Sequence, residues 1–215
     1  MKTIRLADLE QDDALFQPIC RCLDDGKLVC FPGRGAYRIA ADLTSKAAVG
    51  RLLQSKRRTG KAPALVFIAD RAMLAQVADE VPPLAERLAR AFWPGSLTIL
   101  FRAHPGLPGK VVKPLLKANG RLGVRIPADP VARRISTEFG RPLLISSANV
   151  ARKQGSSSPA QVRKNFMGRV DLFVDGGDLP DGGSSTVVRV EDGAYTVTRE
   201  GRIPEAEIAR RVAAG

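Results

Sequence analysis

The chain has 215 residues, of which 44% are hydrophobic and 26% charged, and its formal net charge is +12. This length is enough for a buried core, and we expect one domain over residues 1–215. The excess of Lys and Arg favours anionic partners such as nucleotides or RNA, although a merely basic surface explains it equally well. No apolar stretch reaches membrane-spanning length and no signal-peptide pattern follows Met1, so we expect a cytoplasmic protein without a membrane partner.

Several kinds of site are disfavoured by residue type alone. The three cysteines, Cys20, Cys22 and Cys30, contain no Cys-x-x-Cys pair, and the single histidine, His104, lies far from them in the sequence. A zinc site is therefore not expected, and free thiols are the simpler interpretation. We predict no metal site made by protein side chains. A Ser-His-Asp triad and a P-loop motif are also missing.

The hydrophobic pattern predicts the following elements in chain order. A helix over 13–25, a strand over 27–31, a helix from 44 or 45 to about 57, a strand over 64–69 and a helix over 83–92 come first. Strands over 97–102 and 122–126 follow, then a helix from Asp129-Pro130 to Gly140, a strand over 143–146 and a helix from Ser158-Pro159. Strands over 170–174, 186–190 and 195–198 come next, the last two as a hairpin, before a helix over 204–214.

These elements alternate without strict regularity, and strands follow one another directly late in the chain. The pattern therefore predicts an α/β fold in which helices pack on a mixed parallel and antiparallel sheet. Short polar motifs fall at the strand ends, where loops can converge on one site.

Cations and hydroxyls dominate these motifs. Lys56 and Arg58 stand where a helix ends and could hold a triphosphate, or could form a solvated basic helix end. Ser147 and Asn149 follow a buried strand and could bind phosphate, ribose or a carboxylate, or cap a turn. Arg125, in an apolar strand, needs an anionic partner, which could be a ligand carboxylate or an internal acidic residue.

Read together, the motifs resemble the YrdC/TsaC family of threonylcarbamoyl-adenylate synthases. The similarity spans about residues 10–205 and rests on six segments in the family's order. They are Lys56-x-Arg58, Trp93-Pro94-Gly95-x-Leu97-Thr98, Val124-Arg125-Ile126-Pro127, Ser147-Ala148-Asn149, Ser185-Thr186-Val187-Val188 and Arg199-x-Gly201.

The resemblance implies a YrdC-like fold, a twisted mixed sheet with flanking helices around a basic concave cleft. It implies a nucleotidyltransferase that makes threonylcarbamoyl-AMP from ATP, bicarbonate and L-threonine, or a related acceptor, for the t6A modification of tRNA. ATP would act with Mg²⁺ as a substrate complex, and no tightly bound cofactor is expected. The oligomeric state is left open.

The resemblance also implies residue roles. Lys56 and Arg58 would be catalytic and would bind ATP, together with Thr98, Ser147, Asn149 and Arg199. Arg125, Ser185 and Tyr37 would bind threonine.

One stretch departs from the family pattern Pro-Thr-Glu-Thr-x-Tyr-Gly-Leu, because this chain reads Pro32-Gly33-Arg34-Gly35-Ala36-Tyr37-Arg38-Ile39. Phe67 stands where the family has a histidine, and Ala151-Arg152 replaces a Ser-Gly pair. The losses fall mostly on the threonine side. The alternative function is a divergent paralogue that acts as a nucleotide- or RNA-binding module. The net charge of +12 and the added arginines support it, so Arg34, Arg38 and Arg152 are RNA-binding candidates.

Overall fold

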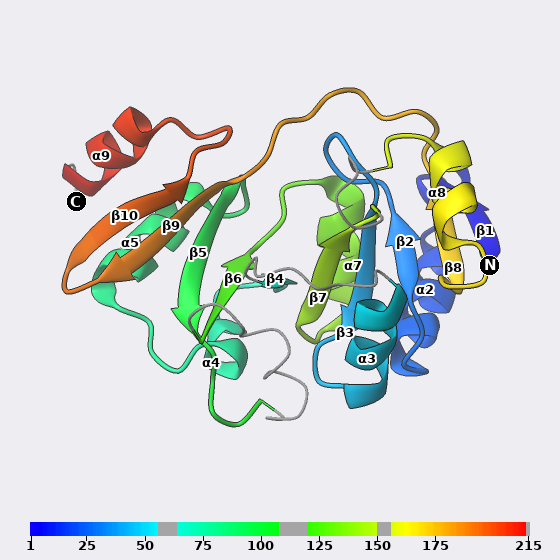
Figure 1. Ribbon diagram of the computed structural model, residues 1–215, viewed down its shortest axis with the longest axis horizontal. Helices are drawn as coiled ribbons and strands as arrows, with labels where there is room; N and C mark the ends of the chain where they lie inside the picture. The colour runs from blue at the N-terminus through cyan, green and yellow to red at the C-terminus, as the bar shows by residue number, and fades with distance from the viewer. Residues whose placement is uncertain (56–63, 108–119, 150–155, 214–215) are drawn as a thin grey trace.

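The computed structural model describes residues 1–55, 64–107, 120–149 and 156–213 (Figure 1). All of the strands in these ranges belong to one ten-stranded sheet with the order β1-β8-β2-β3-β7-β4-β6-β5-β9-β10. The strands are β1 (Lys2–Arg5), β2 (Val29–Phe31), β3 (Arg38–Asp42), β4 (Ala64–Phe67), β5 (Leu97–Arg102), β6 (Arg121–Arg125), β7 (Leu143–Ser147), β8 (Leu172–Asp175), β9 (Thr186–Glu191) and β10 (Ala194–Arg199).

The sheet mixes both strand orientations. The pairs β1/β8, β2/β8, β4/β6 and β5/β9 are parallel, and the pairs β2/β3, β3/β7, β4/β7, β5/β6 and β9/β10 are antiparallel. The predicted α/β fold, a mixed sheet with helices packed on it, is confirmed.

The helices form two layers. They are α1 (Leu6–Leu9), α2 (Phe16–Asp24), α3 (Lys46–Ser55), α4 (Leu74–Val77), α5 (Pro83–Phe92), α7 (Pro130–Phe139), α8 (Pro159–Phe166) and α9 (Glu205–Ala213), and a 3₁₀ turn (Asp13–Leu15) precedes α2. One face of the sheet carries α3, α4, α5, α8 and α9 around a single buried cluster. The other face carries α1, α2 and α7, whose apolar residues pack on β1, β2, β3, β4, β7 and β8.

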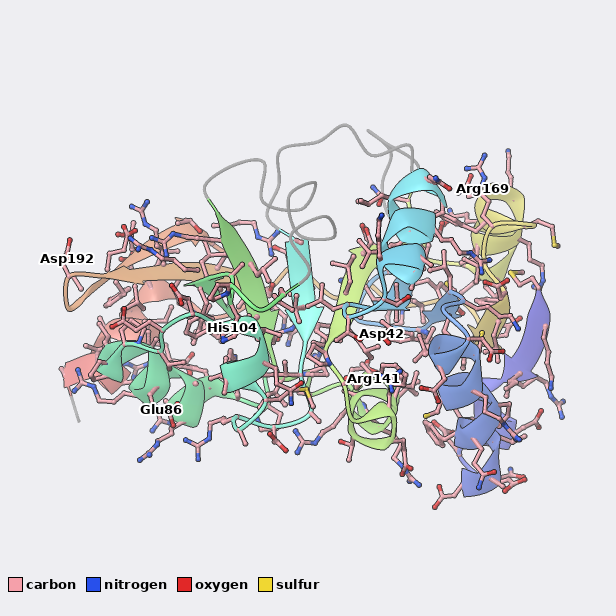
Figure 2. The ribbon with its side chains drawn as sticks, turned by 90° about the horizontal axis from the view of Figure 1, so that it is seen from below. Asp42, Glu86, His104, Arg141, Arg169 and Asp192 are labelled. Atoms are coloured by element: carbon pink, nitrogen blue, oxygen red, sulfur yellow. The ribbon has the colours of Figure 1, made fainter. Side chains whose placement is uncertain are left out.

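The sheet twists strongly along its length. Figure 2 shows α3 on one side of the molecule and α5, marked by Glu86, on the opposite side, although both pack against the same buried cluster. Each strand is rotated by roughly 20–25° from its neighbour in a typical sheet, so ten strands accumulate about half a turn. The two layers therefore exchange sides from one end of the sheet to the other.

Local sequence signals set several boundaries as predicted. Helix α7 begins at Pro130, and the Asp129 side chain accepts a hydrogen bond from the Ala132 N–H at 3.3 Å. It ends at Gly140, which adopts the left-handed conformation at φ 66° that glycine tolerates best. The hairpin between β9 and β10 turns at Asp192 and Gly193, both with positive φ.

Four elements were not predicted: β1, α1, β3 and α4. Strand β3 has the sequence Arg-Ile-Ala-Ala-Asp, and its two alanines carry little strand preference. It forms because β2 and β7 pair with it on both sides. Cys20, Cys22 and Cys30 are free thiols, as predicted. Within the described ranges, no helix is long and apolar enough to cross a bilayer.

Candidate active site

Most of the predicted site residues that the structure describes lie on one face of the sheet, whereas Tyr37 is buried in the cluster on the other face. Val124, Ile99 and Val188 are buried in the cluster beneath α4, α5 and α9. Side chains alternate along a strand, so their neighbours Arg125, Thr98 and Val187 point to the opposite face. We call this opposite face of β3–β7–β4–β6–β5–β9–β10 the site face. Of the described helices, α1, α2 and α7 pack on this side of the sheet, over the strands from β1 to β4 in the strand order.

A β-bulge brings Arg199 to the site face. Val197 pairs with Val188, but the register then shifts, so that Arg199 rather than Thr198 is the partner of Val187. Without the extra residue, Arg199 would point to the opposite face of the sheet, which α5 and α9 cover. Bulges of this kind redirect a side chain, and here the redirected side chain is a guanidinium.

Thr98, Ser185 and Arg199 form one hydrogen-bonded group on this face. The Thr98 hydroxyl donates to Ser185 Oγ at 3.0 Å, and Arg199 Nη2 donates to the same Oγ at 3.0 Å. Arg199 also donates to the Ser185 carbonyl from Nε at 3.2 Å and from Nη2 at 2.9 Å. This arrangement fixes an exposed guanidinium beside two hydroxyls, which suits phosphate or carboxylate oxygens.

Gly201 is required by a close approach of two backbone segments. A Cβ at this position would lie 2.5 Å from the Ser184 carbonyl oxygen and 2.5 Å from the Thr186 nitrogen. Atoms cannot approach that closely, so only glycine lets the chain after β10 pass against the start of β9. The same start of β9 holds Arg199 through Ser185.

Arg38, Ser147 and Asn149 lie on the β3–β7 side of the site face. Arg38 and Ser147 are direct partners in the antiparallel pair β3/β7 and so point the same way. The Ser147 hydroxyl donates to Asn149 Oδ1 at 2.7 Å. The Arg38 side chain passes over Gly33, where an added Cβ would lie 2.8 Å from Arg38 Cγ.

Arg125 lies between these two groups, on top of an aromatic ring. Its guanidinium carbon is 4.9 Å from the centre of the Phe67 ring, and the two residues are partners in the parallel pair β4/β6. Its Nε is buried and has no hydrogen-bond partner. Burial, followed by the charges of Arg38 and Arg199, lowers the pKa of Arg125 to about 10. Among the described residues it makes no ion pair, and of the internal acidic residues Asp129 acts on its pKa through charge alone.

Arg34 and Asp129 complete the surroundings of Arg125. Burial lowers the pKa of Arg38, and Arg199 lowers it further, while Asp129 acts in the opposite direction. Burial raises the pKa of Asp129, against hydrogen bonds from the first turn of α7 and the charge of Arg34. Around Arg125, the guanidinium groups of Arg34, Arg38 and Arg199 and the carboxylate of Asp129 therefore act on one another through their charges.

Comparison with known proteins decides the family. The Sua5/YciO/YrdC family model, described as "Telomere recombination", matches residues 21–201. This chain belongs to the Sua5/YciO/YrdC family.

The curated relatives that match this chain are named for the same activity. The threonylcarbamoyl-AMP synthase of Pyrococcus abyssi is 33% identical over 186 residues, which are 86% of this chain and 53% of that protein. The chain thus spans about half the length of this relative. The threonylcarbamoyl-AMP synthase of Halorhodospira halophila is 31% identical over 156 residues, which are 72% of this chain and 78% of that protein. A crystal structure of P. abyssi Sua5 complexed with L-threonine superimposes with a TM-score of 0.84, at 28% identity, over 98% of this chain and 60% of that one.

Three predicted residues lie outside the described residues: Lys56, Arg58 and Arg152. Tyr37 is described and fully buried. Its hydroxyl donates to the Gly177 carbonyl at 2.7 Å and accepts from the Gly176 N–H at 3.0 Å, and burial raises its pKa to about 12. Tyr37 thus anchors the turn after β8, and a direct contact with an amino acid stays a prediction.

Sequence reasoning missed Asp129 and the support that Phe67 gives to Arg125. Asp129 was read only as a helix start, and Phe67 only as a lost polar residue. The alternation of residues in β4 and β6 can place the side chains of Phe67 and Arg125 on one face. The register that makes these two residues partners is a property of the assembled sheet.

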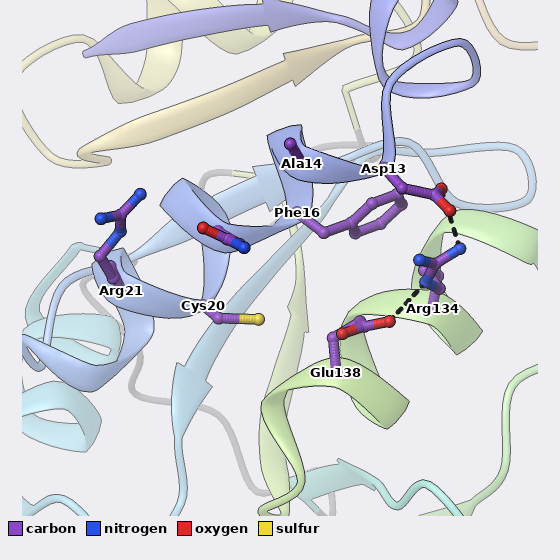
Figure 3. Close-up of a pocket in the computed structure, with 8 residues that line it drawn as sticks. Asp13, Ala14, Phe16, Cys20, Arg21, Arg134 and Glu138 are labelled. Carbon is purple, nitrogen blue, oxygen red and sulfur yellow. Dashed lines mark hydrogen bonds and ion pairs between the residues drawn. The ribbon is translucent and has the colours of Figure 1, made fainter.

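A groove between α2 and α7 contains none of the predicted site residues (Figure 3). Arg134, one of the residues that line it, forms an ion pair with Asp13 at 3.0 Å and another with Glu138 at 2.7 Å. Its charges are therefore already balanced. No group of three His, Cys, Asp or Glu side chains that could hold a metal ion occurs within the described ranges.

Proposed function

We propose that this chain is an ATP-dependent carbamoyl-adenylate synthase of the threonylcarbamoyl-AMP synthase type, a nucleotidyltransferase. The observation that carries the proposal is the Thr98–Ser185–Arg199 group beside an unpaired Arg125 on the site face. The names of the relatives and the L-threonine complex of P. abyssi Sua5 support it. The product would serve the t6A modification of tRNA, in the cytoplasm.

The reaction would proceed in two steps. The amine of the amino acid attacks bicarbonate, and loss of water leaves a carbamate. A carbamate oxygen then attacks the α-phosphorus of ATP, the bond to the β-phosphate oxygen breaks, and pyrophosphate leaves with its electron pair. Most of the catalysis would come from positioning and charge stabilisation.

The chain's own residues divide this work. Lys56, Arg58 and Arg199 would neutralise the charge that develops on the phosphates, and Mg²⁺ would arrive with ATP as part of the substrate. Thr98, Ser147 and Asn149 would contact the nucleotide. Arg125 and Ser185 would bind the amino acid, and Tyr37 would support the neighbouring loop.

Pyrophosphate release tests the proposal. We expect release that requires ATP, bicarbonate and an amino acid together, and that falls at least tenfold with Arg199→Ala or Lys56→Ala, about 1.4 kcal/mol per lost contact. Arg189→Ala is a matched control, because Arg189 is a half-buried arginine of β9 paired with Glu191 at 3.1 Å. If calorimetry shows no nucleotide binding to the unaltered protein, the proposal fails.

The second candidate is a nucleotide- or RNA-binding module. The exposed Arg34 and the net charge of +12 favour it, whereas Arg38 is half-buried and packs over Gly33. Binding to structured RNA should then weaken steeply with salt, and Arg34→Ala should flatten the slope of log affinity against log salt by roughly one unit. An unchanged slope, or no binding at low salt, would exclude Arg34 from an RNA contact.

A further inference from the structure

We propose that Arg34 and Arg38, next to Arg125, form a subsite for a second acidic group on the acceptor, so that the preferred acceptor is an amino acid with an acidic side chain. The inference rests on the proposed function for the nucleotide half of the site and names the substrate class of the acceptor half. The acidic group can be a carboxylate or a phosphate, because guanidinium groups bind both in the same way.

The charge balance of the site face is the first argument. Arg34, Arg38 and Arg125 form no ion pair with any described residue, and Asp129 is the one described carboxylate that acts on the pKa values of Arg38 and Arg125. The Asp129 carboxylate is already committed, because it caps the first turn of α7 through the Ala132 N–H. One partly buried carboxylate cannot neutralise three guanidinium groups.

The unpaired Nε of Arg125 is the second argument. A buried charged group without a hydrogen-bond partner is costly, and such atoms usually have a ligand or water as a partner. Arg121, on the same strand, shows the ordinary solution, because it forms an ion pair with Glu191. Arg125 instead rests on the Phe67 ring, which offers a flat surface and no hydrogen-bond acceptor. No described residue therefore satisfies this buried donor, and the guanidinium keeps its charge for an incoming anion.

The packing of Arg38 is the third argument. An added Cβ at residue 33 would lie 2.8 Å from Arg38 Cγ and 3.2 Å from Arg38 Nε, so the missing side chain of Gly33 makes room for Arg38. Gly35 has φ 67°, and Gly182 approaches it so closely that a Cβ there would lie 2.5 Å from the Gly35 nitrogen. These glycines hold the β2–β3 loop, and with it Arg34, against the chain that runs from β8 to β9 along the upper edge of the sheet (Figure 1).

The size of the charge decides the kind of acceptor. The α-carboxylate of any amino acid brings one negative charge, which one guanidinium can bind with two parallel hydrogen bonds. A neutral side chain such as that of threonine would leave two guanidinium groups without an anion. An acidic side chain brings the additional negative charge to the same face.

Acceptors that differ only in charge test the inference. Aspartate and glutamate should each give a kcat/KM for pyrophosphate release at least tenfold above asparagine and glutamine, and above threonine. O-phosphoserine against serine tests the phosphate form of the same chemistry. A threonine kcat/KM equal to or above that of both acidic amino acids and of O-phosphoserine would overturn the inference and leave the proposed function standing.

Binding separates the two proposals. In calorimetry with a non-hydrolysable ATP analogue, aspartate or glutamate should bind at least tenfold more tightly than its amide. The double variant Arg34→Gln with Arg38→Gln should remove this preference. The control variant Arg189→Gln should keep it, because the native Arg189 is paired with Glu191. The preference without pyrophosphate release would support the subsite while refuting the synthase. Equal binding of acid and amide, or a double variant that weakens only the nucleotide, would overturn the subsite.

Discussion

Replacing Arg125 with methionine should make the protein more stable and less active at the same time. Methionine keeps a long, flexible and apolar side chain over the Phe67 ring but removes the charge. The guanidinium it replaces has a buried Nε without a partner and lies near Arg38 and Arg199. A buried charge without an ion pair opposes folding, and a well-packed apolar residue relieves that opposition.

The size of the effect follows from the lowered pKa. Burial first, and then the neighbouring arginines, lower the pKa of Arg125 to about 10. One pH unit corresponds to about 1.4 kcal/mol, so the charged form is destabilised by on the order of 3 kcal/mol. Water near a half-buried side chain reduces this figure, and the lost contact with Phe67 removes about 1 kcal/mol of attraction. The net gain in the free energy of unfolding should be about 1–2 kcal/mol.

Urea denaturation at pH 7 measures the gain, with Arg121→Met as the control on the same strand. Arg121 is paired with Glu191, so its replacement should destabilise the protein and leave pyrophosphate release intact. The penalty from Arg125 is present below its folded pKa of about 10 and disappears as the pH rises above its value in the unfolded chain, so the advantage of Arg125→Met should shrink only in strong alkali. If Arg125→Met destabilises as Arg121→Met does, Arg125 supports the fold and is not held ready for an anion.

Three further predictions concern the support of the site. The hydroxyl of the fully buried Thr186 donates to the Ile203 carbonyl at 2.7 Å and accepts from the Ile203 N–H at 3.0 Å. In urea denaturation, Thr186→Val should therefore lower the free energy of unfolding by about 2–5 kcal/mol, and Thr186→Ser, which keeps the hydroxyl, by about 1 kcal/mol. Equal losses would contradict this. Gly201→Ala should separate β9 from the chain after β10 and weaken nucleotide binding at least tenfold in calorimetry; an unchanged affinity would refute the close approach. Burial raises the pKa of Cys22 to about 11 and also raises that of Cys30. Alkylation at pH 7, read by mass spectrometry, should therefore leave both thiols unmodified, and the rate at Cys22 should rise about tenfold per pH unit above pH 7. Rapid labelling at pH 7 would contradict the burial.

Local signals in the sequence predicted most of the elements. Residues 83–92 and 97–102 were predicted to within the residue, because Pro83 starts a helix with a clear apolar face and an apolar run follows the Trp-Pro-Gly turn. Strand β3 was missed, since its Ala-rich sequence becomes a strand only between β2 and β7. Such an element depends on its neighbours and not on its own residues.

The candidate site was predicted in part for the same reason. The motifs identified Thr98, Arg125, Ser185 and Arg199, because their residue types suit an anionic ligand. The hydrogen bonds among them depend on the bulge before Arg199 and on the parallel pairing of β5 with β9. The β5/β9 pairing joins residues far apart in the sequence, and the bulge depends on the register of the β9–β10 hairpin, so no pattern within a single strand reports either.

Strand β1 stays unpaired during synthesis until β8 has been made. Lys2 lies opposite Leu172, so β1 waits for about 170 more residues to be made before its partner exists. At typical elongation rates of roughly 5–20 residues per second, this wait is on the order of 10–30 s. During that time the β1 edge of the sheet stays open, and the apolar segments of the chain are open to chaperones or to a neighbouring nascent chain. Slower translation after residue 175 would give β1 and β8 time to pair before the C-terminal hairpin is added.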